Sequence, residues 1–177
     1  MPATLKDLMA VLPQQGRLDW IGLRPGRGEA MTEADTAIIE IGSGLAGDRF
    51  RGRPDSKRQV TLIQAEHLPA VASLLHRASI DPALLRRNLV VSGLNLLALK
   101  DKRFRVGEVV LEMTGLCHPC SKMETIFGAG GYNALRGHGG ITTRVIQGGC
   151  IRVGDPVEVL SSHRAPVQTA FDDLTTG

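Results

Sequence analysis

Apolar residues recur at helical spacing in a few short segments, and these segments predict the helices of the chain. They are residues 4–12, residues 64–77, a stretch that begins at Asp81 and Pro82, and residues 121–127. Thr4 is a suitable N-cap for the first helix, and Pro13 ends it. Pro69 is compatible with the second helix only because it falls in the first turn.

Short runs rich in Val, Ile and other apolar residues predict strands, most of them in the second half of the chain. These runs are residues 17–23, 36–41, 59–63, 88–91, 103–106, 108–114, 142–147 and 157–160. Residues 104–108 are echoed by residues 151–155, which predicts that one tight glycine turn is used twice. Residues 147–150 are expected to join the last strands as a hairpin. The pattern predicts a mostly β fold, α+β by content, built as a β-barrel with peripheral helices.

The amino-acid composition agrees with a β-barrel, and the chain length limits the number of domains. The chain has 177 residues, which suits one ordinary domain, and its 21 glycines and 9 prolines favour many tight turns. We expect residues 1–16 to form a helical lead-in and residues 17–160 to form the barrel domain. Residues 161–177 are polar and lack periodicity, so we expect a flexible C-terminal tail.

Several classes of protein are disfavoured by the sequence. No apolar run approaches the roughly 20 residues that a membrane-spanning helix needs. The first 13 residues carry Lys6 and Asp7 and lack a small-residue cleavage site, so a signal peptide is not expected. Three cysteines are an odd number for a disulfide scaffold and favour a reducing, cytoplasmic location.

Basic residues point to an anionic ligand, although not to a nucleic acid. Of the 21 basic residues 16 are arginine, and the net charge is +3. Arginine offers a planar fork for phosphate or carboxylate, while a GC-rich coding bias explains the same composition equally well. The densest basic stretch, residues 49–58, lacks the interleaved aromatic residues on which single-stranded nucleic acids stack.

Residues 117–122, with the sequence CHPCSK, are the most unusual segment. Cys120 precedes a predicted helix start, and this position together with Lys122 favours its thiolate. Three interpretations are open: a structural zinc site completed by Cys150 and His138, a thioredoxin-like dithiol, and a single soft nucleophile or metal ligand. Zinc needs four ligands and the dithiol needs a βαβ unit that the pattern here does not provide. The third interpretation is therefore favoured, with inert buried thiols as a further alternative.

Six short blocks follow one another along the chain. They are GLAGDR at 44–49, RQVTLI at 58–63, RRNLVVSG at 86–93, FRVG at 104–107, PCSK at 119–122 and RVIQGGCIRVGD at 144–155. In order and approximate spacing these blocks resemble the MOSC domain, the C-terminal domain of molybdenum-cofactor sulfurases. The resemblance covers roughly residues 19–160. It implies a stand-alone, strongly bent β-barrel of the MOSC type, cytosolic in bacteria.

The resemblance also implies a role for one cysteine. The family's essential cysteine lies in a Pro-Cys-x-Lys-like block and falls here on Cys120, which would carry sulfur or ligate molybdenum. Cys117 matches an extra cysteine of some members, and no catalytic role is carried over to it. The sequence contains neither the aminotransferase-like domain of the full sulfurases nor the additional N-terminal β-barrel of the amidoxime-reducing relatives.

The leading hypothesis is a component of an oxidoreductase that uses the molybdenum cofactor (molybdopterin) to reduce N-hydroxylated compounds, with Cys120 as catalytic residue and molybdenum ligand. The expected cofactor-binding residues are Asp48, Arg49, Arg58, Arg87, Asn88, Lys122 and Arg144. We expect at least two of the four arginines to converge near Cys120 and bind the phosphate of the anionic pterin. Asn88 is expected to bind the pterin amide edge, and Asp48 to orient an arginine.

The sequence shows no flavin or haem motif, so the electrons are expected to come from a separate reductase. The alternative hypothesis is a sulfur carrier. In that case Cys120 would hold a persulfide received from a separate cysteine desulfurase and deliver it to metal-sulfur cluster or cofactor assembly.

Overall fold

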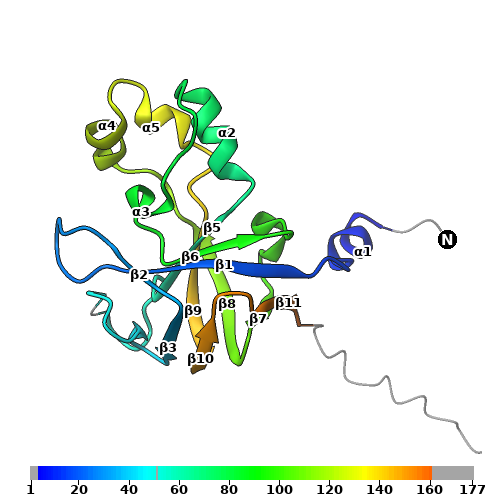
Figure 1. Ribbon diagram of the computed structural model, residues 1–177. Coiled ribbons are helices and arrows are strands. Elements are labelled where there is room, and N and C mark those ends of the chain that lie inside the picture. Colours follow the sequence, from blue (N-terminus) through cyan, green and yellow to red (C-terminus); the bar gives the residue numbers. More distant parts are fainter. Residues whose placement is uncertain (1–3, 51, 161–177) are drawn as a thin grey trace, which may run out of the picture.

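A closed β-barrel of seven strands forms the centre of the molecule in a computed structural model that describes residues 4–50 and 52–160 (Figure 1). Its strands are β1 (Gly16–Leu23), β5 (Val60–Gln64), β6 (Leu89–Ser92), β7 (Arg103–Val106), β8 (Val109–Leu116), β9 (Ile141–Gln147) and β11 (Pro156–Val159). The order is β11-β7-β8-β9-β5-β6-β1, and β1 closes the ring by pairing with β11. Only the β5–β6 pair of this ring is parallel. The predicted mostly β barrel with peripheral helices is confirmed.

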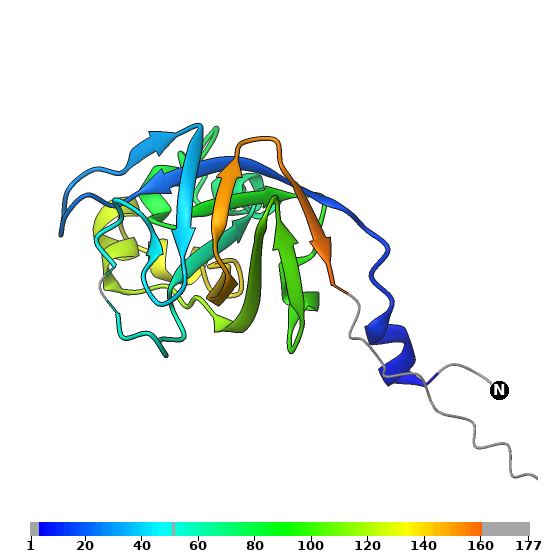
Figure 2. The same cartoon turned by 90° about the horizontal axis from the view of Figure 1, so that it is seen from below.

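Four further strands lie beside or outside the ring, and one corrects an expectation. β2 (Thr32–Ala34) extends the sheet from β1, while β10 (Gly149–Arg152), β3 (Thr36–Glu40) and β4 (Gly44–Leu45) form a separate small sheet, visible in Figure 2. The predicted hairpin at residues 147–150 is wrong, because β10 pairs with β3 and not with β9. Gly148 packs so closely on the Ile39 carbonyl that a Cβ would collide with it, so the chain turns there onto β3.

Two hydrophobic clusters explain why the central strands lack simple alternation. Val60 and Leu62 of β5 point into the barrel, whereas Ile63 of the same strand belongs to a second cluster under the helices. β5 is therefore buried on both faces and reads as a continuous apolar run. The second cluster includes Val71 and Phe127.

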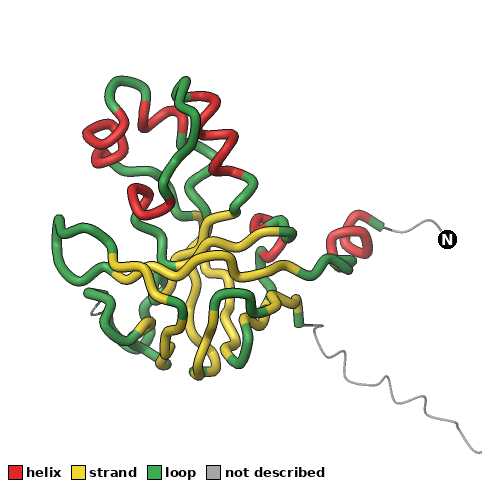
Figure 3. Tube along the Cα trace, in the orientation of Figure 1, coloured by secondary structure: helices red, strands yellow, loops and turns green. Residues whose placement is uncertain are grey.

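The helices α2 (His67–Leu74), α3 (Pro82–Leu85), α4 (Ser121–Phe127) and α5 (Gly131–Ala134) gather at one end of the barrel, as Figure 3 shows. α2 packs outside the barrel as predicted, but it begins at His67 rather than near residue 64. The 3-10 turn η1 (Leu96–Leu99) follows β6. The helical end of the barrel is where the chain places Cys120.

The N-terminal helix α1 (Leu5–Ala10) extends away from the barrel (Figure 1). Thr4 and Asp7 form a capping box at its start, with Thr4 accepting from the Asp7 amide at 3.2 Å. The hydrogen bond from Thr4 lowers the pKa of the Asp7 carboxyl. No helix of the described chain is long and apolar enough to span a membrane. The predicted tail, residues 161–177, lies outside the described residues.

Candidate functional site

The segment between β8 and α4 presents two thiols in different environments. Cys117 directly follows β8 and is buried, and its amide donates to the Gly140 carbonyl at 2.8 Å. Cys120 is exposed and is the N-cap residue of α4, with its carbonyl accepting from the Met123 amide at 2.9 Å. The fold therefore fixes the backbone at both cysteines and opens only the Cys120 thiol to solvent.

Arg87 anchors this segment from the opposite side. Its guanidinium donates to the carbonyls of Gly139 at 2.7 Å, Leu85 at 2.8 Å and Cys117 at 3.5 Å. Burial lowers the pKa of Arg87, while the charges of thiolates at Cys117 and Cys120 raise it. The guanidinium thus lies within electrostatic reach of both thiols and is held in place by three carbonyl oxygens.

Glycines make this close packing possible. A Cβ on Gly139 would collide with the Cys117 carbonyl, and one on Gly140 would collide with the Leu62 carbonyl. Gly140 also has a φ of +87°, in the left-handed region that other residues rarely adopt. The chain between α5 and β9 therefore lies directly against both β5 and the start of the cysteine segment.

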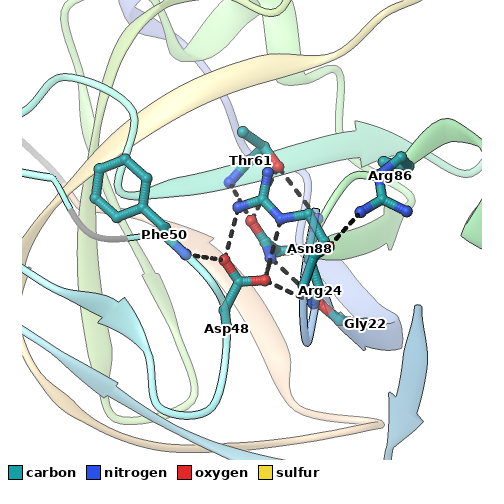
Figure 4. A network of polar contacts seen from close by, with 8 residues as sticks. Gly22, Arg24, Asp48, Phe50, Thr61, Arg86 and Asn88 are labelled. Carbon is teal, nitrogen blue, oxygen red and sulfur yellow. Dashed lines mark hydrogen bonds and ion pairs between the residues drawn. The ribbon is translucent and has the colours of Figure 1, made fainter. Parts of the chain in front are cut away.

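A buried ion pair lies beside this region (Figure 4). Arg24 forms a bidentate pair with Asp48, with nitrogen-oxygen distances of 3.0 and 2.7 Å, and its amide donates to the same carboxylate at 2.7 Å. The Asp48 side chain is only 1% exposed and also accepts from the Phe50 amide at 3.1 Å. Burial opposes ionisation of Asp48, but the hydrogen bonds and charge of Arg24 outweigh it and lower the pKa of the carboxyl.

Asn88 links the ion pair to the barrel. Its side-chain oxygen accepts from the Thr61 amide at 3.2 Å and the Thr61 hydroxyl at 3.0 Å. Its side-chain nitrogen donates to the Gly22 carbonyl at 3.3 Å and to Asp48 at 3.2 Å. These four bonds use both lone pairs and both hydrogens of the amide, so in this structure Asn88 positions Asp48 from within the core.

A surface hollow of about 880 Å³ opens next to the cysteine segment. It is lined by His118, Pro119, Tyr132, Asn133, Arg136 and Gly137. Two of these lining residues, His118 and Pro119, belong to the cysteine segment and directly precede Cys120 in the sequence. The site combines an accessible thiol, the Arg87 guanidinium within electrostatic reach of it, and a polar depression large enough for a small molecule.

A family model described as the MOSC domain matches residues 44–158 of the sequence. The chain belongs to the MOSC domain family. The match begins at β4 and ends within β11, so it takes in the six blocks and the cysteine segment. Comparison with curated proteins gave no match.

Solved structures with the same fold include two kinds of bacterial protein. The YuaD protein from Bacillus subtilis superposes with a TM-score of 0.72 and 19% identity, over 84% of this chain and 97% of that one. YiiM from Geobacillus stearothermophilus superposes with a TM-score of 0.68 and 15% identity, over 82% of this chain and 75% of that one. YiiM from Escherichia coli superposes with a TM-score of 0.64 and 21% identity, over 82% of this chain and 70% of that one. At these identities the likeness shows the fold alone.

Within this MOSC domain the predicted arginines fall in different places. Arg58 and Arg87 lie close enough for the charge of Arg58 to lower the pKa of Arg87, after the larger effect of burial. Arg49 is exposed and lies near Arg86, whose pKa is lowered by burial first and then by the charges of Arg24 and Arg49. Lys122 is exposed in the first turn of α4.

Arg144 is engaged in an ion pair on the barrel wall. It lies on β9 opposite Glu112 of β8 and forms an ion pair with that residue. Glu112 also pairs with Arg103 at 3.1 Å, and hydrogen bonds from Arg144 and Arg103 lower the pKa of its carboxyl. Ile141, which pairs with Leu116 beside the cysteine segment, is three residues away from Arg144 along β9.

Two arginines of the site have no sequence signal that would single them out. Arg24 directly follows β1, just before the Pro25–Gly26 turn, and Arg86 adopts a left-handed conformation with φ +57° as the C-cap of α3. Arg86 donates to the Glu29 carbonyl at 2.5 Å. Tyr132 and Arg136 of the hollow lie in a glycine-rich segment that matched no known motif.

The structure also bears on the other interpretations of the cysteines. Among residues 4–50 and 52–160, no group of three His, Cys, Asp or Glu side chains is arranged to hold a metal ion. Cys150 lies on β10, next to Ile38 of β3, and its amide donates to Glu108 at 3.2 Å. β8, which leads into the cysteine segment, runs antiparallel to both neighbours and provides no βαβ unit. A four-ligand zinc site and a thioredoxin-like dithiol are therefore not supported.

Replacing Arg87 with lysine is expected to destabilise the protein by about 1–3 kcal/mol, because an ammonium cannot span the three carbonyls that the guanidinium bonds. Urea denaturation measures this loss. Arg105→Lys is the matched control, since Arg105 is exposed on β7 and should tolerate the change. Equal stabilities for the two variants would contradict an anchoring role for Arg87.

Proposed function

We propose that this MOSC protein binds a molybdenum cofactor through Cys120 and reduces N-hydroxylated compounds. The observation that carries the proposal is the exposed Cys120 thiol at the start of α4, within electrostatic reach of the half-buried Arg87. A thiolate is a soft ligand and suits a molybdenum centre that already has sulfur ligands. It is also the thiol on which the Pro-Cys-x-Lys-like block falls in the sequence resemblance.

The donor set fits an anionic pterin cofactor. Arg24, Arg49, Arg58, Arg86 and Arg87 form one electrostatically connected group. The Asp48 carboxylate neutralises Arg24 directly, which leaves an excess of positive charge beside the thiols. Exposed Arg49 and Arg58 are free to turn their guanidinium forks toward a phosphate. When bound, the cofactor supplies the two-electron redox chemistry of the reaction.

The residues of the chain then have separate tasks. Cys120 binds the metal, and Arg87 holds the backbone of the cysteine segment through the Cys117 carbonyl. Arg49 and Arg58 bind the cofactor phosphate, and Lys122 adds positive charge beside the thiolate. Arg144 could join the phosphate contacts only by leaving its ion pair with Glu112.

The hollow beside Cys120 is the proposed place for the substrate. Tyr132 is 41% exposed there and offers a ring face for a planar amidine or base. The Asn133 amide can pair with the N-hydroxyl group, and the His118 imidazole can donate a proton to the departing hydroxyl. Reduction consumes two electrons and two protons per N-hydroxyl group and releases water. A separate cytoplasmic reductase is the proposed electron source.

Metal analysis tests the proposal. The protein is produced in a host that makes the molybdenum cofactor and, in parallel, in a host deficient in it. We expect close to one molybdenum per chain from the first host and none from the second. Cofactor-loaded protein should also oxidise a reduced dye when an amidoxime is added. Absence of molybdenum from both preparations would reject the proposal.

The second candidate, a sulfur carrier, is favoured by one feature. Two thiols three residues apart share the influence of Arg87, and an exposed thiolate of this kind can hold a persulfide. Protein of this type would release sulfur to cyanide and contain no molybdenum. The same two preparations therefore distinguish the candidates, with a cysteine desulfurase as the partner in the second case.

A further inference from the structure

The surface hollow described above carries positive charge without a matching negative one. Its lining includes Arg136 and His118, but no Asp or Glu residue. Arg136 is exposed, and it takes part in none of the ion pairs formed by residues 4–50 and 52–160. Its guanidinium is therefore available to pair with an anion that enters the hollow.

The acidic side chain bonded to this part of the chain is committed to the backbone. Glu124 of α4 accepts from the Gly130 amide at 2.8 Å and from the Tyr132 amide at 2.9 Å, with one carboxylate oxygen for each. The hydrogen bonds from Tyr132 and Gly130 lower the pKa of the Glu124 carboxyl, which keeps it ionised as a backbone acceptor. This carboxylate holds the turn in place and is not among the residues that line the hollow.

The turn that carries Asn133 and Arg136 is anchored to the core. Leu135, between them, is only 1% exposed, and Gly131 packs so closely on the Met123 carbonyl that a Cβ would collide with it. The Arg136 amide donates to the Asn133 carbonyl at 3.2 Å, and side chains three residues apart in such a turn lie on the same side. The amide and the guanidinium thus line the hollow together, from a backbone that a ligand does not have to order.

The second positive group of the hollow strengthens the demand for an anion. In the proposed reaction the protonated imidazole of His118 donates a proton, so it is cationic when the substrate binds. A neutral substrate leaves both this charge and that of Arg136 unpaired. An oxyanion on the substrate offsets both, and a guanidinium binds it through two parallel, charge-assisted hydrogen bonds.

We propose that the substrates of this site are planar N-hydroxylated compounds that also carry a carboxylate or phosphate group, and that Arg136 selects them. The inference rests on the proposed function, in which the hollow receives the substrate. Tyr132 contacts the planar part of the substrate, Asn133 its N-hydroxyl group, and Arg136 its oxyanion. Because Arg136 is exposed to solvent, we expect the oxyanion to strengthen binding about fivefold, the upper end for an ion pair of this kind.

An NMR titration with three probes tests the proposal. The probes are benzamidoxime, which is neutral, and two derivatives that carry a carboxylate or a phosphonate in the para position. Tyr132 is the only tyrosine of the chain, so its ring resonances report directly on occupancy of the hollow. Both anionic probes should shift these resonances at about fivefold lower concentration than benzamidoxime does. The stronger of the two identifies carboxylate or phosphate as the natural group.

Substitutions of Arg136 show whether the preference comes from its charge. Arg136→Gln should bind the anionic and neutral probes equally well, whereas Arg136→Lys should keep part of the preference because it keeps the charge. Arg105→Gln is the matched control, since Arg105 is exposed on β7 and does not line the hollow. Equal affinities for all probes in the unmodified chain would overturn the proposal. So would a preference that survives in Arg136→Gln, or binding that leaves the Tyr132 resonances unchanged.

The titration is carried out on the full chain from both hosts, so the two proposals can fail separately. Molybdenum in the first preparation without a preference for the anionic probes would overturn this inference and leave the proposed function standing. A preference that depends on Arg136, in chains that never contain molybdenum, would reject the proposed function and support the hollow as an anion-selective site.

Discussion

Replacing Cys120 with serine is expected to abolish molybdenum retention and the reduction of an amidoxime, while leaving the fold intact. A hydroxyl is a hard ligand that holds its proton more firmly than a thiol, so it does not replace a thiolate at a sulfur-rich metal centre. Cys120 is exposed, and no core packing is lost on substitution. The measurements are molybdenum per chain, turnover with a reduced dye, and the urea midpoint of the variant.

Cys117→Ser and Cys150→Ser are the matched controls and should keep most of the metal and activity. Cys117 is buried and anchored through its backbone, and Cys150 lies on β10 in the small sheet. Alkylation of single-cysteine variants across a pH series should show Cys120 as the fastest-reacting thiol, because it is the exposed one. Retention of molybdenum by the Cys120 variant would remove the basis for both proposed functions.

The sequence predicts the barrel well because its signals are local. Glycines with positive φ end strands at defined points, as Gly107 does between β7 and β8. The start of α4 follows from the residues around Cys120, and the helix occupies residues 121–127 as expected. Predicted strand boundaries mostly agree with the structure within one or two residues.

Elements set by distant contacts are the ones that the sequence does not reveal. β4 has two residues and exists because Gly44, with φ +78°, packs against the Gln59 carbonyl and pairs with β3. The repeated glycine turn is used in two ways. Gly107 closes a hairpin, whereas Gly154 carries the chain from the small sheet back to the barrel. Near-identical local sequence therefore leads to different pairing.

The residues of the candidate site also divide into those that a sequence motif marks and those that only the fold brings together. Cys120 could be selected from its motif, whereas the partner of Asp48 could not, because Arg24 lies 24 residues earlier and is joined to it only by the fold. The ion pair of Arg144 with Glu112 depends on the register of β8 and β9. Asp48 was expected to orient an arginine, and in the structure its carboxylate bonds Arg24. Whether these residues bind a pterin stays a prediction.

The Asp48 network joins three parts of the barrel. Arg24 follows β1, Asp48 follows β4, and Asn88 precedes β6 while bonding Thr61 of β5. The carboxylate is the acceptor common to Arg24, Phe50 and Asn88. Removing its charge leaves a largely buried guanidinium without a counter-ion next to other arginines. The expected consequence is lost stability at the same end of the molecule as the thiols.

Asp48→Asn should therefore lower the free energy of unfolding by about 3 kcal/mol. This is the lower end of the range for breaking a buried ion pair, because the Arg24 side chain is still 17% exposed. Urea denaturation at pH 7 measures this value. Asp19→Asn is the matched control: its pair with Arg17 is long at 3.7 Å and solvent-exposed, so its loss should cost below about 0.5 kcal/mol. Similar losses for both variants would contradict a structural role for the Asp48 network.

The pH dependence of the same variant gives an independent check. The folded pKa of Asp48 is lowered, so its ionised form stabilises the protein above the unfolded pKa of about 3.9. That contribution is lost as the pH falls through the lowered pKa that Asp48 has in the folded protein. The stability difference between wild type and Asp48→Asn should accordingly stay constant from neutral pH to about pH 5 and shrink below about pH 4. A difference that instead grows on acidification would mean that the carboxyl is protonated in the folded state, and the ion pair with Arg24 would not be the source of the stability.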